Sequence, residues 1–468
     1  MNLSKSDVLN VRHVRALGFD TSSVERLRCV STDSRTTQPG DLFVAIRGEK
    51  FDAHDFITKA IGGGASMVIV DRKWADTNGT MLVSIAVPRL VVEDTTVALG
   101  ELAALYRAKF KIPFIAIAGS NGKTTTKNMI SAVLGTKYNV LSTEGNLNNH
   151  VGVPQTLFRL TEDHEVAVVE IGTNHFRELE YLCRILAPTH GLITNIGREH
   201  LEFFGSLEGV TKAEGELLDW LKSNKGIFFL NKDDTHLVKR TKGLRGLKIV
   251  SFALQAKRTD VKGTFLGSNE YGSGRFAFRR QGKQSYEVQL SVPGEQNVRN
   301  ALAASAVGSA MKVSNRSIVK ALTEFTAAGK RSEVLHLNGL TLLNDSYNAN
   351  PDSVIEALKT LRMIKTAKRR IVVFGDMLEL GRAAEKEHRS IGKAMAQYRV
   401  DCLFTFGKFS KITNESAVLK VKSHFDDKVS LAEQLADLIT SGDAVLVKGS
   451  RGMKMEDVVN RLQQKFKD

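Results

Sequence analysis

The stretch that decides the fold is FIAIAGSNGKTTT, residues 114–126. Its first five residues are apolar and predict a buried strand, and the glycine-containing segment after them predicts a tight loop. The following residues, KTTTKNMISAVLGTKY (123–138), predict a helix. A loop that opens a helix presents backbone N–H groups and the positive end of the helix dipole to an anion. We therefore expect an α/β domain that holds a phosphate group at this loop.

The loop has most features of a nucleotide-binding loop. Gly119 and Gly122 allow close approach of the backbone to phosphate, Lys123 can reach the β- and γ-phosphates, and the Thr124 hydroxyl can bind Mg²⁺. The usual pattern GxxxxGK[ST] would need glycine at position 117, where this chain has Ile117, so the loop is a variant. A glycine-rich turn with a surface lysine is the alternative. The predicted triphosphate-binding residues are Gly119, Ser120, Asn121, Gly122, Lys123, Thr124 and Thr125.

Composition places the chain among globular, cytoplasmic proteins. With 468 residues it is long enough for about three domains, and its 42% hydrophobic content is sufficient for large cores. No apolar run approaches the ~18 residues of a membrane span, and residues 1–20 lack the apolar segment of a secretory signal. The three cysteines, Cys29, Cys183 and Cys402, are far apart and form no CxxC pair, which favours a reducing compartment.

The formal net charge of +15 raises the question of a nucleic-acid partner or an anionic membrane surface. Lysine and arginine are scattered without a long basic block, and no helix-turn-helix or RNP-like pattern occurs. We therefore expect no nucleic-acid partner. A basic surface that favours anionic small substrates is the simpler interpretation.

Three segments differ in character: 1–110, 111–326 and 327–468. The first contains short strands and turns, with a buried strand at ASMVIVD (65–71) and a helix at TTVALGELAALYRAKF (95–110). The second alternates strands and helices, which predicts a mainly parallel sheet with helices on both faces, extended by antiparallel hairpins over about 247–293. The third repeats the alternation with strands at 340–347, 369–377, 402–407 and 444–449, typical of a smaller Rossmann-like α/β domain.

Two further clusters carry chemical groups. EVAVVEIGTNH (165–175) places Glu170 at the end of an apolar strand, where a carboxylate beside the phosphate loop would hold Mg²⁺ or its water. A solvated strand end is the alternative. In ITNIGREHLE (193–202), His200 follows another strand and precedes Glu214, on a predicted helix, by 14 residues. The two could bind a second cation near a triphosphate, although His200 alone would as readily be structural.

Taken together, six motifs resemble the Mur ligase family of ATP-dependent amide ligases. Within the family, four stretches are similar to the members that add D-alanyl-D-alanine to UDP-N-acetylmuramoyl-tripeptide: residues 33–56, 143–157, 344–353 and 375–381. The six family motifs are AGSNGKTTT (118–126), VVEIG (168–172), ITNIGREHLE (193–202), GEQNVRNALAA (294–304), NDSYNANPDS (344–353) and VKGSRGMKME (447–456), which together cover nearly the whole chain.

The resemblance implies a division of labour. Residues 1–110 would bind the UDP-MurNAc-tripeptide, 111–326 ATP with Mg²⁺, and 327–468 the incoming D-Ala-D-Ala. The implied reaction activates a substrate carboxylate as an acyl phosphate and joins it to the amine, in cytoplasmic peptidoglycan precursor synthesis for cell-wall growth and division. The expected partners are these small molecules, the chain has no predicted transmembrane segment, and a monomer is expected.

The resemblance also implies roles for particular residues. Asn300 would contact the adenine with Asn297 nearby, Arg331 would reach the ATP phosphates, and Asp345 would contact the ribose or help to close that domain interface. Lys123, Glu170, His200 and Glu214 form the implied catalytic set, and the implied metal ligands are Thr124, Glu170 and His200. The candidate substrate-binding residues are Ser34, Arg35, Thr143, Asn146, Asn148, Asn149, Asn174, His175, Asn348 and Asn350.

Some of these assignments have simpler alternatives. The hydroxyl of Ser34 and the guanidinium of Arg35 suit a nucleotide or diphosphate. The amides of residues 146–149 suit a sugar-peptide, but an Asn-rich loop can instead satisfy its own backbone. Asn348 and Asn350 would line the acceptor pocket or form an Asx-rich turn before Pro351.

The sequence departs from the family pattern at one chemically important position. Glu214 stands where most members have a lysine that takes up CO₂ to become a carbamate. We hypothesise that Glu214 supplies this negative charge directly, with a water molecule connecting it to the second Mg²⁺. A surface acid on an amphipathic helix is the alternative. Milder departures from the family pattern occur at four other positions: Gln296, Lys330, Phe176 and Arg177. Arg177 leaves open whether the tripeptide ends in lysine or diaminopimelate.

Two other functions are alternatives to this one. A sibling ligase that uses another amine, such as a diaminopimelate- or lysine-adding enzyme or a folylpolyglutamate synthase-like one, is opposed by NDSYNANPDS and GDMLELG. A non-catalytic nucleotide-binding scaffold is opposed by the intact Lys123, Thr124, Glu170 and His200.

Overall fold

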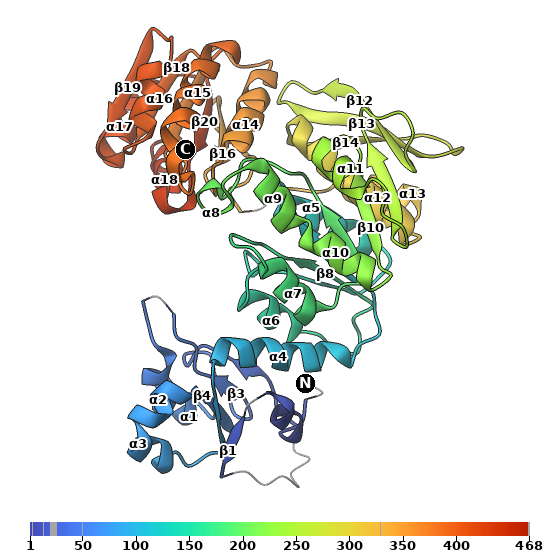
Figure 1. Cartoon of the computed structure of the whole chain (residues 1–468). Helices are drawn as coiled ribbons and strands as arrows, with labels where there is room; N and C mark the ends of the chain where they lie inside the picture. Colours follow the sequence, from blue (N-terminus) through green and yellow to red (C-terminus); the bar gives the residue numbers. More distant parts are fainter. Residues whose placement is uncertain (2, 13, 19–25, 49, 328, 467–468) are drawn as a thin grey trace. The chain divides into compact units, whose positions relative to one another are not determined.

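The computed structural model is an α/β structure with three β-sheets (Figure 1). It describes residues 1, 3–12, 14–18, 26–48, 50–327 and 329–466. Two compact units make up the chain. Met1–Ala116, Asn139–Gly172 and Glu178–Thr189 form the first, and Ile117–Tyr138, Thr173–Arg177 and His190–Asp468 form the second. The α/β class predicted from the sequence is confirmed. Among the described residues, no helix is long and apolar enough to span a bilayer.

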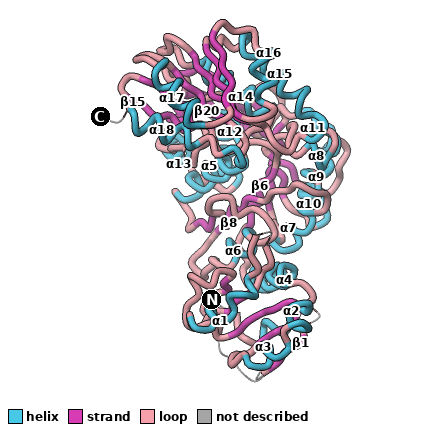
Figure 2. Tube along the Cα trace, turned by 90° about the vertical axis from the view of Figure 1, so that its left-hand side faces the viewer, coloured by secondary structure: helices cyan, strands magenta, loops and turns pink. Residues whose placement is uncertain are grey.

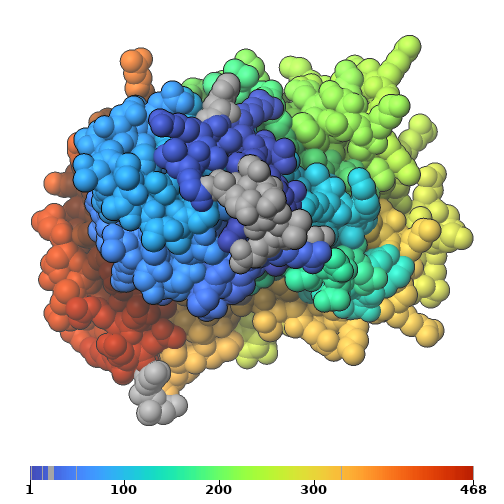
Figure 3. All heavy atoms as spheres, turned by 90° about the horizontal axis from the view of Figure 1, so that it is seen from below, coloured from blue at the N-terminus to red at the C-terminus, as the bar shows by residue number. Residues whose placement is uncertain are grey.

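The first sheet has the strand order β1-β5-β4-β3-β2, and all its pairings are parallel except β1 with β5. Strand β4 is buried along its whole length, as its apolar sequence predicts. Figure 3 shows residues of this region in blue on one face of the molecule. The strands are β1 (Arg15–Leu17), β2 (Val30–Ser31), β3 (Leu42–Val44), β4 (Met67–Asp71) and β5 (Arg89–Val92); the helices are η1 (Ser6–Asn10), η2 (Ala53–Phe56), α1 (Ile57–Gly62), α2 (Arg72–Thr77), α3 (Gly79–Ser84) and α4 (Thr95–Ala108).

The second sheet has nine strands in the order β14-β13-β12-β11-β10-β9-β6-β8-β7. Strands β9 to β12 pair in parallel, and β12, β13 and β14 pair in antiparallel fashion. The strands are β6 (Phe114–Ala118), β7 (Val140–Ser142), β8 (Val166–Glu170), β9 (His190–Ile193), β10 (Ile227–Asn231), β11 (Lys248–Ala253), β12 (Val261–Ser268), β13 (Ser273–Arg280) and β14 (Tyr286–Pro293).

The predicted hairpin region begins later than the sequence suggested. β11 lies within the range expected to be antiparallel, yet it pairs in parallel with β10 in the register Ile227 to Lys248. The reason is α11, which connects the two strands as a crossover and returns the chain in the same direction. The helices of this region are α5 (Lys123–Gly135), α6 (Gly152–Leu157), α7 (Glu178–Leu186), α8 (Leu201–Phe204), α9 (Leu207–Glu214), α10 (Glu216–Ser223), α11 (Thr235–Thr241), α12 (Glu295–Ala310) and α13 (Asn315–Thr323).

The third sheet has six strands in the order β15-β16-β20-β17-β18-β19, parallel except for β15. It contains the four predicted strands and two more at its edges, β15 and β19. Its strands are β15 (Glu333–Leu337), β16 (Leu340–Asp345), β17 (Arg370–Gly375), β18 (Cys402–Phe406), β19 (Val421–Phe425) and β20 (Ala444–Lys448); its helices are α14 (Pro351–Met363), η3 (Gly381–Ala383), α15 (Ala384–Gln397), α16 (Ser410–Ser416), α17 (Lys428–Leu438), η4 (Arg451–Met453) and α18 (Glu456–Lys465).

Helices cover both faces of the third sheet because side chains alternate along its strands. Leu446 of β20 packs with α14 and α15 on one face, and Val445 and Val447 pack with α17 and α18 on the other. Figure 2 shows β20 between these two helix groups. This double coverage explains why the strands are continuous apolar runs rather than alternating ones.

Candidate active site

The phosphate loop connects β6 to α5 and requires glycine at two positions. Gly119 has φ +113° and Gly122 has φ +82°, which L-residues rarely adopt. A Cβ at Gly119 would lie 2.7 Å from the backbone nitrogen of Thr194, and one at Gly122 would lie 2.7 Å from Asn300 Oδ1. The loop therefore packs tightly against the turn after β9 and against α12.

Hydrogen bonds hold the centre of the loop to the turn after β9. The Ser120 hydroxyl accepts from the Gly197 N–H at 2.8 Å, and the Asn121 N–H donates to Asn195 Oδ1 at 3.2 Å. Asn195 Nδ2 donates back to the Asn121 carbonyl at 2.8 Å. From the third sheet's region, Asn350 Nδ2 donates to Asn121 Oδ1 at 2.9 Å. Ser120 and Asn121 thus fix the loop, and their side chains already have protein partners.

Three residues open α5 after Gly122. The Lys123 ammonium donates to the Gly119 carbonyl at 2.5 Å and lies 3.4 Å from Glu199 Oε2, so it folds back along the loop. Thr124 is buried, and its hydroxyl has no hydrogen-bond partner among the described residues. Thr125 is half-buried beside it. The unsatisfied Thr124 oxygen is suited to a bound cation or phosphate, since buried hydroxyls rarely remain unpaired.

Two buried carboxyl groups lie beside Lys123. Glu214, at the end of α9, is 1% exposed, and Glu199 is 5% exposed. The Glu214 carboxyl lies beside that of Glu199, close to the Gly119 N–H and to Lys123. Burial raises the pKa of Glu214 well above its usual value, and the adjacent Glu199 raises it further. Glu214 is therefore a component of the loop and not the surface acid considered as the alternative.

His200 immediately follows Glu199 and has a left-handed backbone, with φ +46°. Its Nδ1 lies 2.8 Å from Glu379 Oε2 in the loop after β17. The nearby His200 ring lowers the pKa of Glu379 against the opposing effect of burial. A non-glycine residue in this conformation is typical of functional sites. His200 thus connects the ATP-loop region to the third sheet's region through one ring nitrogen, leaving Nε2 for another ligand.

Glu170 lies in the first compact unit and is 1% exposed. Its Oε1 accepts from Asn148 Nδ2 at 2.8 Å, and its backbone N–H donates to the Thr143 hydroxyl at 2.9 Å. The other oxygen, Oε2, has no hydrogen-bond partner among the described residues. The solvated strand end considered as the alternative does not describe this buried side chain, and the structure brings together three predicted site residues: Glu170, Asn148 and Thr143.

The residues expected to contact adenosine lie in two places within the second unit. Asn297 and Asn300 share one face of α12, and Asn300 Nδ2 donates to Asn297 Oδ1 at 3.2 Å. Asn300 adjoins Gly122. In the third sheet's region, Arg331 stacks on the Tyr347 ring at 3.6 Å, and Asp345 Oδ2 accepts from Lys448 at 2.5 Å.

Several predicted substrate-binding asparagines have structural partners. Asn350 caps α14 with a capping box, its Oδ1 accepting from the Ser353 N–H at 2.8 Å. Asn149 Oδ1 accepts from the N–H groups of Val151 and Gly152 at the start of α6. The turn interpretation therefore describes these two side chains, because the Asx oxygen satisfies nearby backbone donors.

The remaining predicted substrate residues are more accessible. Arg35 is exposed and pairs with Asp33, and this hydrogen bond lowers the pKa of Asp33 to about 2. His175 Nδ1 lies 2.8 Å from Asn174 Oδ1. Ser34 is half-buried in the turn with Arg35, Asn146 is exposed, and Asn348 is exposed with its Oδ1 accepting from the Ala349 N–H at 2.9 Å.

Comparison with known proteins decides the family. Residues 117–308 match the Mur ligase middle domain, residues 330–451 match the Mur ligase glutamate ligase domain, and residues 26–107 match the Mur ligase family catalytic domain. The chain belongs to the Mur ligase family.

Individual Mur ligases align over almost the full length. The chain is 37% identical to the UDP-N-acetylmuramoyl-tripeptide–D-alanyl-D-alanine ligase of Escherichia coli over 94% of both chains, and 33% identical to that of Bacillus subtilis over 92% of both. The crystal structure of MurF from Acinetobacter baumannii superposes with a TM-score of 0.85 at 32% identity, covering 95% of each chain. A MurF ligase from Thermotoga maritima in complex with ADP gives 0.80 at 26% identity, over 94% of this chain and 98% of that one.

Sequence reasoning overlooked three residues of this Mur ligase that the structure places at the site. Glu199 pairs with Glu214, and Arg198 donates to Asp352 Oδ1 at 2.6 Å and to Glu387 at 2.8 Å. Arg451 begins η4, just beyond the loop that follows β20. Glu199 and Arg198 immediately precede His200 in the motif ITNIGREHLE, so their position beside a named residue was the available signal.

Mg²⁺ is the metal that the Mur ligase family implies, and the residues present fit it. Among the described residues, no three His, Cys, Asp or Glu side chains form a ready-made metal cluster. Mg²⁺ in nucleotide sites normally takes only one or two protein oxygens and completes its shell with phosphate and water. The partnerless buried oxygens of Thr124 and Glu170 are ligands of this type.

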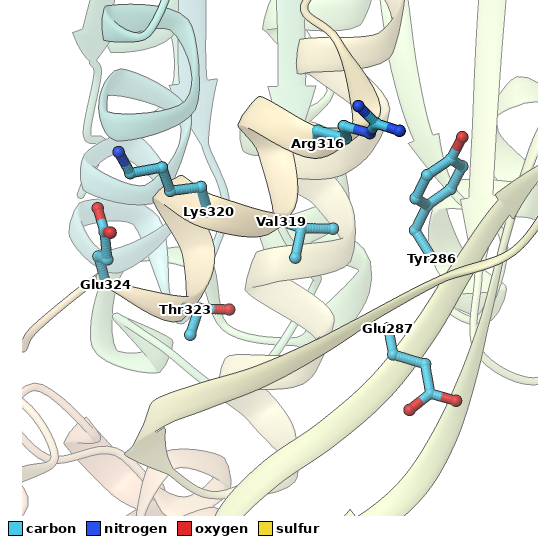
Figure 4. Close-up of a pocket in the computed structure, with 7 residues that line it drawn as sticks. All are labelled: Tyr286, Glu287, Arg316, Val319, Lys320, Thr323 and Glu324. Carbon is cyan, nitrogen blue, oxygen red and sulfur yellow. The ribbon is translucent and has the colours of Figure 1, made fainter.

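A cavity of about 480 Å³ lies elsewhere on this Mur ligase, between β14 and α13 (Figure 4). None of the predicted site residues lines it. Its lining combines two acidic and two basic side chains with a tyrosine, and consists of Tyr286, Glu287, Arg316, Val319, Lys320, Thr323 and Glu324. The cavity is therefore separate from the phosphate loop and from the predicted site residues.

Proposed function

We propose that this Mur ligase adds D-alanyl-D-alanine to UDP-N-acetylmuramoyl-tripeptide with conversion of ATP to ADP and phosphate, a step of peptidoglycan precursor synthesis. The observation that carries the proposal is the 37% identity to the E. coli ligase of that name over 94% of both chains. The phosphate loop, with Lys123 and Thr124 at the start of α5, supports it.

A carboxylate is a poor acyl donor because it lacks a good leaving group, so it must be activated before an amine can attack it. The terminal carboxylate of the tripeptide attacks the γ-phosphorus of ATP, ADP leaves, and an acyl phosphate forms. The dipeptide amine then attacks the acyl carbon, and the tetrahedral intermediate collapses to an amide with loss of phosphate and a proton. Both partners of the first step are anionic, so the protein must mainly neutralise charge and hold the reactants in line.

The chain's own residues divide this task. Lys123 exchanges its contacts with Gly119 and Glu199 for the β- and γ-phosphates, and the loop's N–H groups bind the same oxygens. Asn300 and Asn297 hold the adenine beside Gly122, and Arg331 and Asp345 contact the phosphates and ribose. Thr124 would hold one Mg²⁺, and Glu170 and His200 would hold a second. These ions would supply neutralising charge for the triphosphate and the substrate carboxylate.

Glu214 takes the place of the carbamylated lysine. Its carboxyl lies within the phosphate-loop packing beside the Gly119 N–H and, unlike a lysine, needs no CO₂ to become a carboxylate. Burial and Glu199 favour its neutral form, while the positive charge of Lys123 lowers its pKa and favours the anion. Glu199 extends this acidic group toward Lys123 at 3.4 Å. Because the partnerless oxygens of both carboxyls are buried, they are suited to order water or charge at the γ-phosphate.

The remaining assignments belong to the same proposal. Residues 1–110 bind the UDP-sugar peptide through Ser34 and Arg35, and the amides of Asn146, Asn148 and Asn149 with Thr143 hold its peptide, assisted by Asn174 and His175. Residues 111–326 bind ATP, and 327–468 bind the dipeptide near Asn348 and Asn350. We infer a cytoplasmic monomer, since both ATP and a UDP-linked precursor are cytoplasmic metabolites.

The test is the reaction itself, followed as phosphate release and product mass. The purified chain receives ATP, Mg²⁺ and either the lysine- or the diaminopimelate-ending tripeptide, with D-Ala-D-Ala, L-lysine, meso-diaminopimelate or L-glutamate as acceptor. We expect product only with the dipeptide. Lys123→Ala should lower the rate by about 10²–10³-fold, whereas Lys137→Ala, an exposed lysine just beyond α5, should not. Product with another amine, or none with any, contradicts the proposal.

A further inference from the structure

The third sheet has a reversal in strand order that marks a ligand crevice. β20 follows β19 in the chain but lies between β16 and β17, and the helices after β16 and β17 cover one face while α18 covers the other. In open α/β sheets, ligands bind outside the carboxyl ends of the strands at such a point. The loops after β16 (Ser346–Asn350), β17 (Asp376–Leu380) and β20 (Gly449–Ser450) meet there, because these strands are parallel.

Cationic side chains gather at one end of this crevice, while the loop after β17 contributes Asp376 and Glu379. Lys448 and Asp345 pair with one another at 2.5 Å. Lys330 and Arg451 share one carboxylate, Glu456, at 3.1 and 2.7 Å. Arg331 and Arg451 both lie at the Tyr347 ring, 3.6 and 5.6 Å from its centre. Two guanidinium groups at one ring make this end of the crevice suited to an anionic group of a ligand.

Arg451 is the cation of this group best placed to take a ligand. Arg451 begins η4, after the two loop residues that follow β20, and its backbone N–H donates to Asn348 Oδ1 at 3.3 Å. Glu456 holds only its Nη1, and the side chain remains 58% exposed. Its guanidinium lies 5.6 Å from the Tyr347 ring centre, the ring on which Arg331 stacks at 3.6 Å. Glu456 thus holds the guanidinium in place through Nη1, while the other N–H groups of this exposed side chain can reach a ligand.

We propose that Arg451 binds the terminal carboxylate of the incoming dipeptide. The inference rests on the proposed function, which requires an acceptor with a reactive amine at one end and a carboxylate at the other. Arginine pairs with carboxylates through two parallel N–H bonds, which fixes direction as well as position. Anchoring the carboxylate at Arg451 turns the amine end of the dipeptide away from the crevice wall, toward the acyl phosphate.

The test compares D-alanyl-D-alanine with D-alanyl-D-alaninamide, which has the same amine and no carboxylate. With the wild-type full-length chain we expect kcat/KM to be about 10–100-fold lower for the amide, the range of a charge-assisted hydrogen bond. Arg451→Gln should raise KM for the dipeptide by a similar factor and use both acceptors equally, with KM for ATP and the UDP-tripeptide unchanged. Arg451→Lys should recover part of the preference.

Arg389→Gln, an exposed arginine on α15 of the same region, is the matched control and should retain the wild-type preference. The inference is overturned if the wild-type chain uses both acceptors equally, or if Arg451→Gln keeps the preference or raises KM for ATP instead. These results leave the proposed function intact, since product still forms. A wild-type chain that forms no product with the dipeptide overturns both. Should Arg451→Gln fail to fold, the wild-type comparison and Arg451→Lys decide.

Discussion

Gly119→Ala probes the phosphate loop with the addition of a single methyl group. The new Cβ would lie 2.4 Å from the Thr194 hydroxyl, which can rotate, and 2.7 Å from the Thr194 backbone nitrogen, which cannot. The residue would also keep φ +113°, a region that alanine avoids. Both effects push the loop out of its position against the turn after β9.

The size of the effect can be worked from these distances. Backbone strain of this kind costs about 1–3 kcal/mol. Ordinary contact begins at 3.4 Å, so relieving the 2.7 Å approach requires a displacement of about 0.7 Å. Misplacement near 1 Å can cost about 10²-fold in rate when the positioned group is part of the reacting assembly. We therefore expect kcat/KM for ATP to fall by about 10²-fold and the free energy of unfolding to fall by about 1–3 kcal/mol.

The assay is ADP formation over a range of ATP concentrations, with thermal or denaturant unfolding of the same preparations. Gly135→Ala, in the last turn of α5, is the matched control. A Cβ there meets nothing within 4 Å, so we expect unchanged activity and a gain of about 0.4–1 kcal/mol in stability. Activity of Gly119→Ala within threefold of wild type would refute the reasoning, because the loop would then tolerate the displacement.

Three further results are expected. Glu214→Lys should make phosphate release depend on added bicarbonate, whereas the wild-type chain should need none; a bicarbonate requirement in the wild type contradicts the role assigned to Glu214. Arg198→Gln and Asp352→Asn should each lower the free energy of unfolding by about 1–2 kcal/mol, because each removes the same ion pair at 2.6 Å. The double variant should therefore lose little more than either single variant. Losses that add up in the double variant would show that the two side chains are not coupled. Burial lowers the pKa of His190 to about 4 in the folded chain. As the pH falls, His190 therefore takes up a proton in the unfolded chain before it does so in the folded chain. The free energy of unfolding should thus decline by about 1–3 kcal/mol between about pH 6.5 and pH 4. His190→Phe should reduce this pH dependence, measured by denaturant titration at each pH. An unchanged pH dependence in the variant would contradict the role of His190.

The sequence predicted elements whose signals are local. The run at 114–118 and the two glycines after it specify β6 and the loop without reference to any other part of the chain. Asn297 and Asn300 share a helix face because they are three residues apart. Glu170 was singled out because an acid rarely ends a buried strand without a partner, and its burial agrees with that reasoning.

What the sequence did not predict depends on pairings between distant segments. The Glu199 and Glu214 carboxyls meet only because the turn after β9 packs against α9, which no periodicity indicates. The link from Arg198 to Asp352 spans 154 positions. β11 was assigned to the hairpins because its alternation resembles theirs, while its direction is decided by the crossover helix before it.

The place of β20 has a consequence for how this protein is made. β16 and β17 are synthesised long before β20, yet each has β20 as its neighbour in the finished sheet. Until the ribosome has released residue 448 and beyond, those two strands lack a hydrogen-bonding partner on that side, and the apolar side chains that α17 and α18 later cover remain exposed. We expect a nascent chain stalled before β20 to be a strong substrate for chaperones.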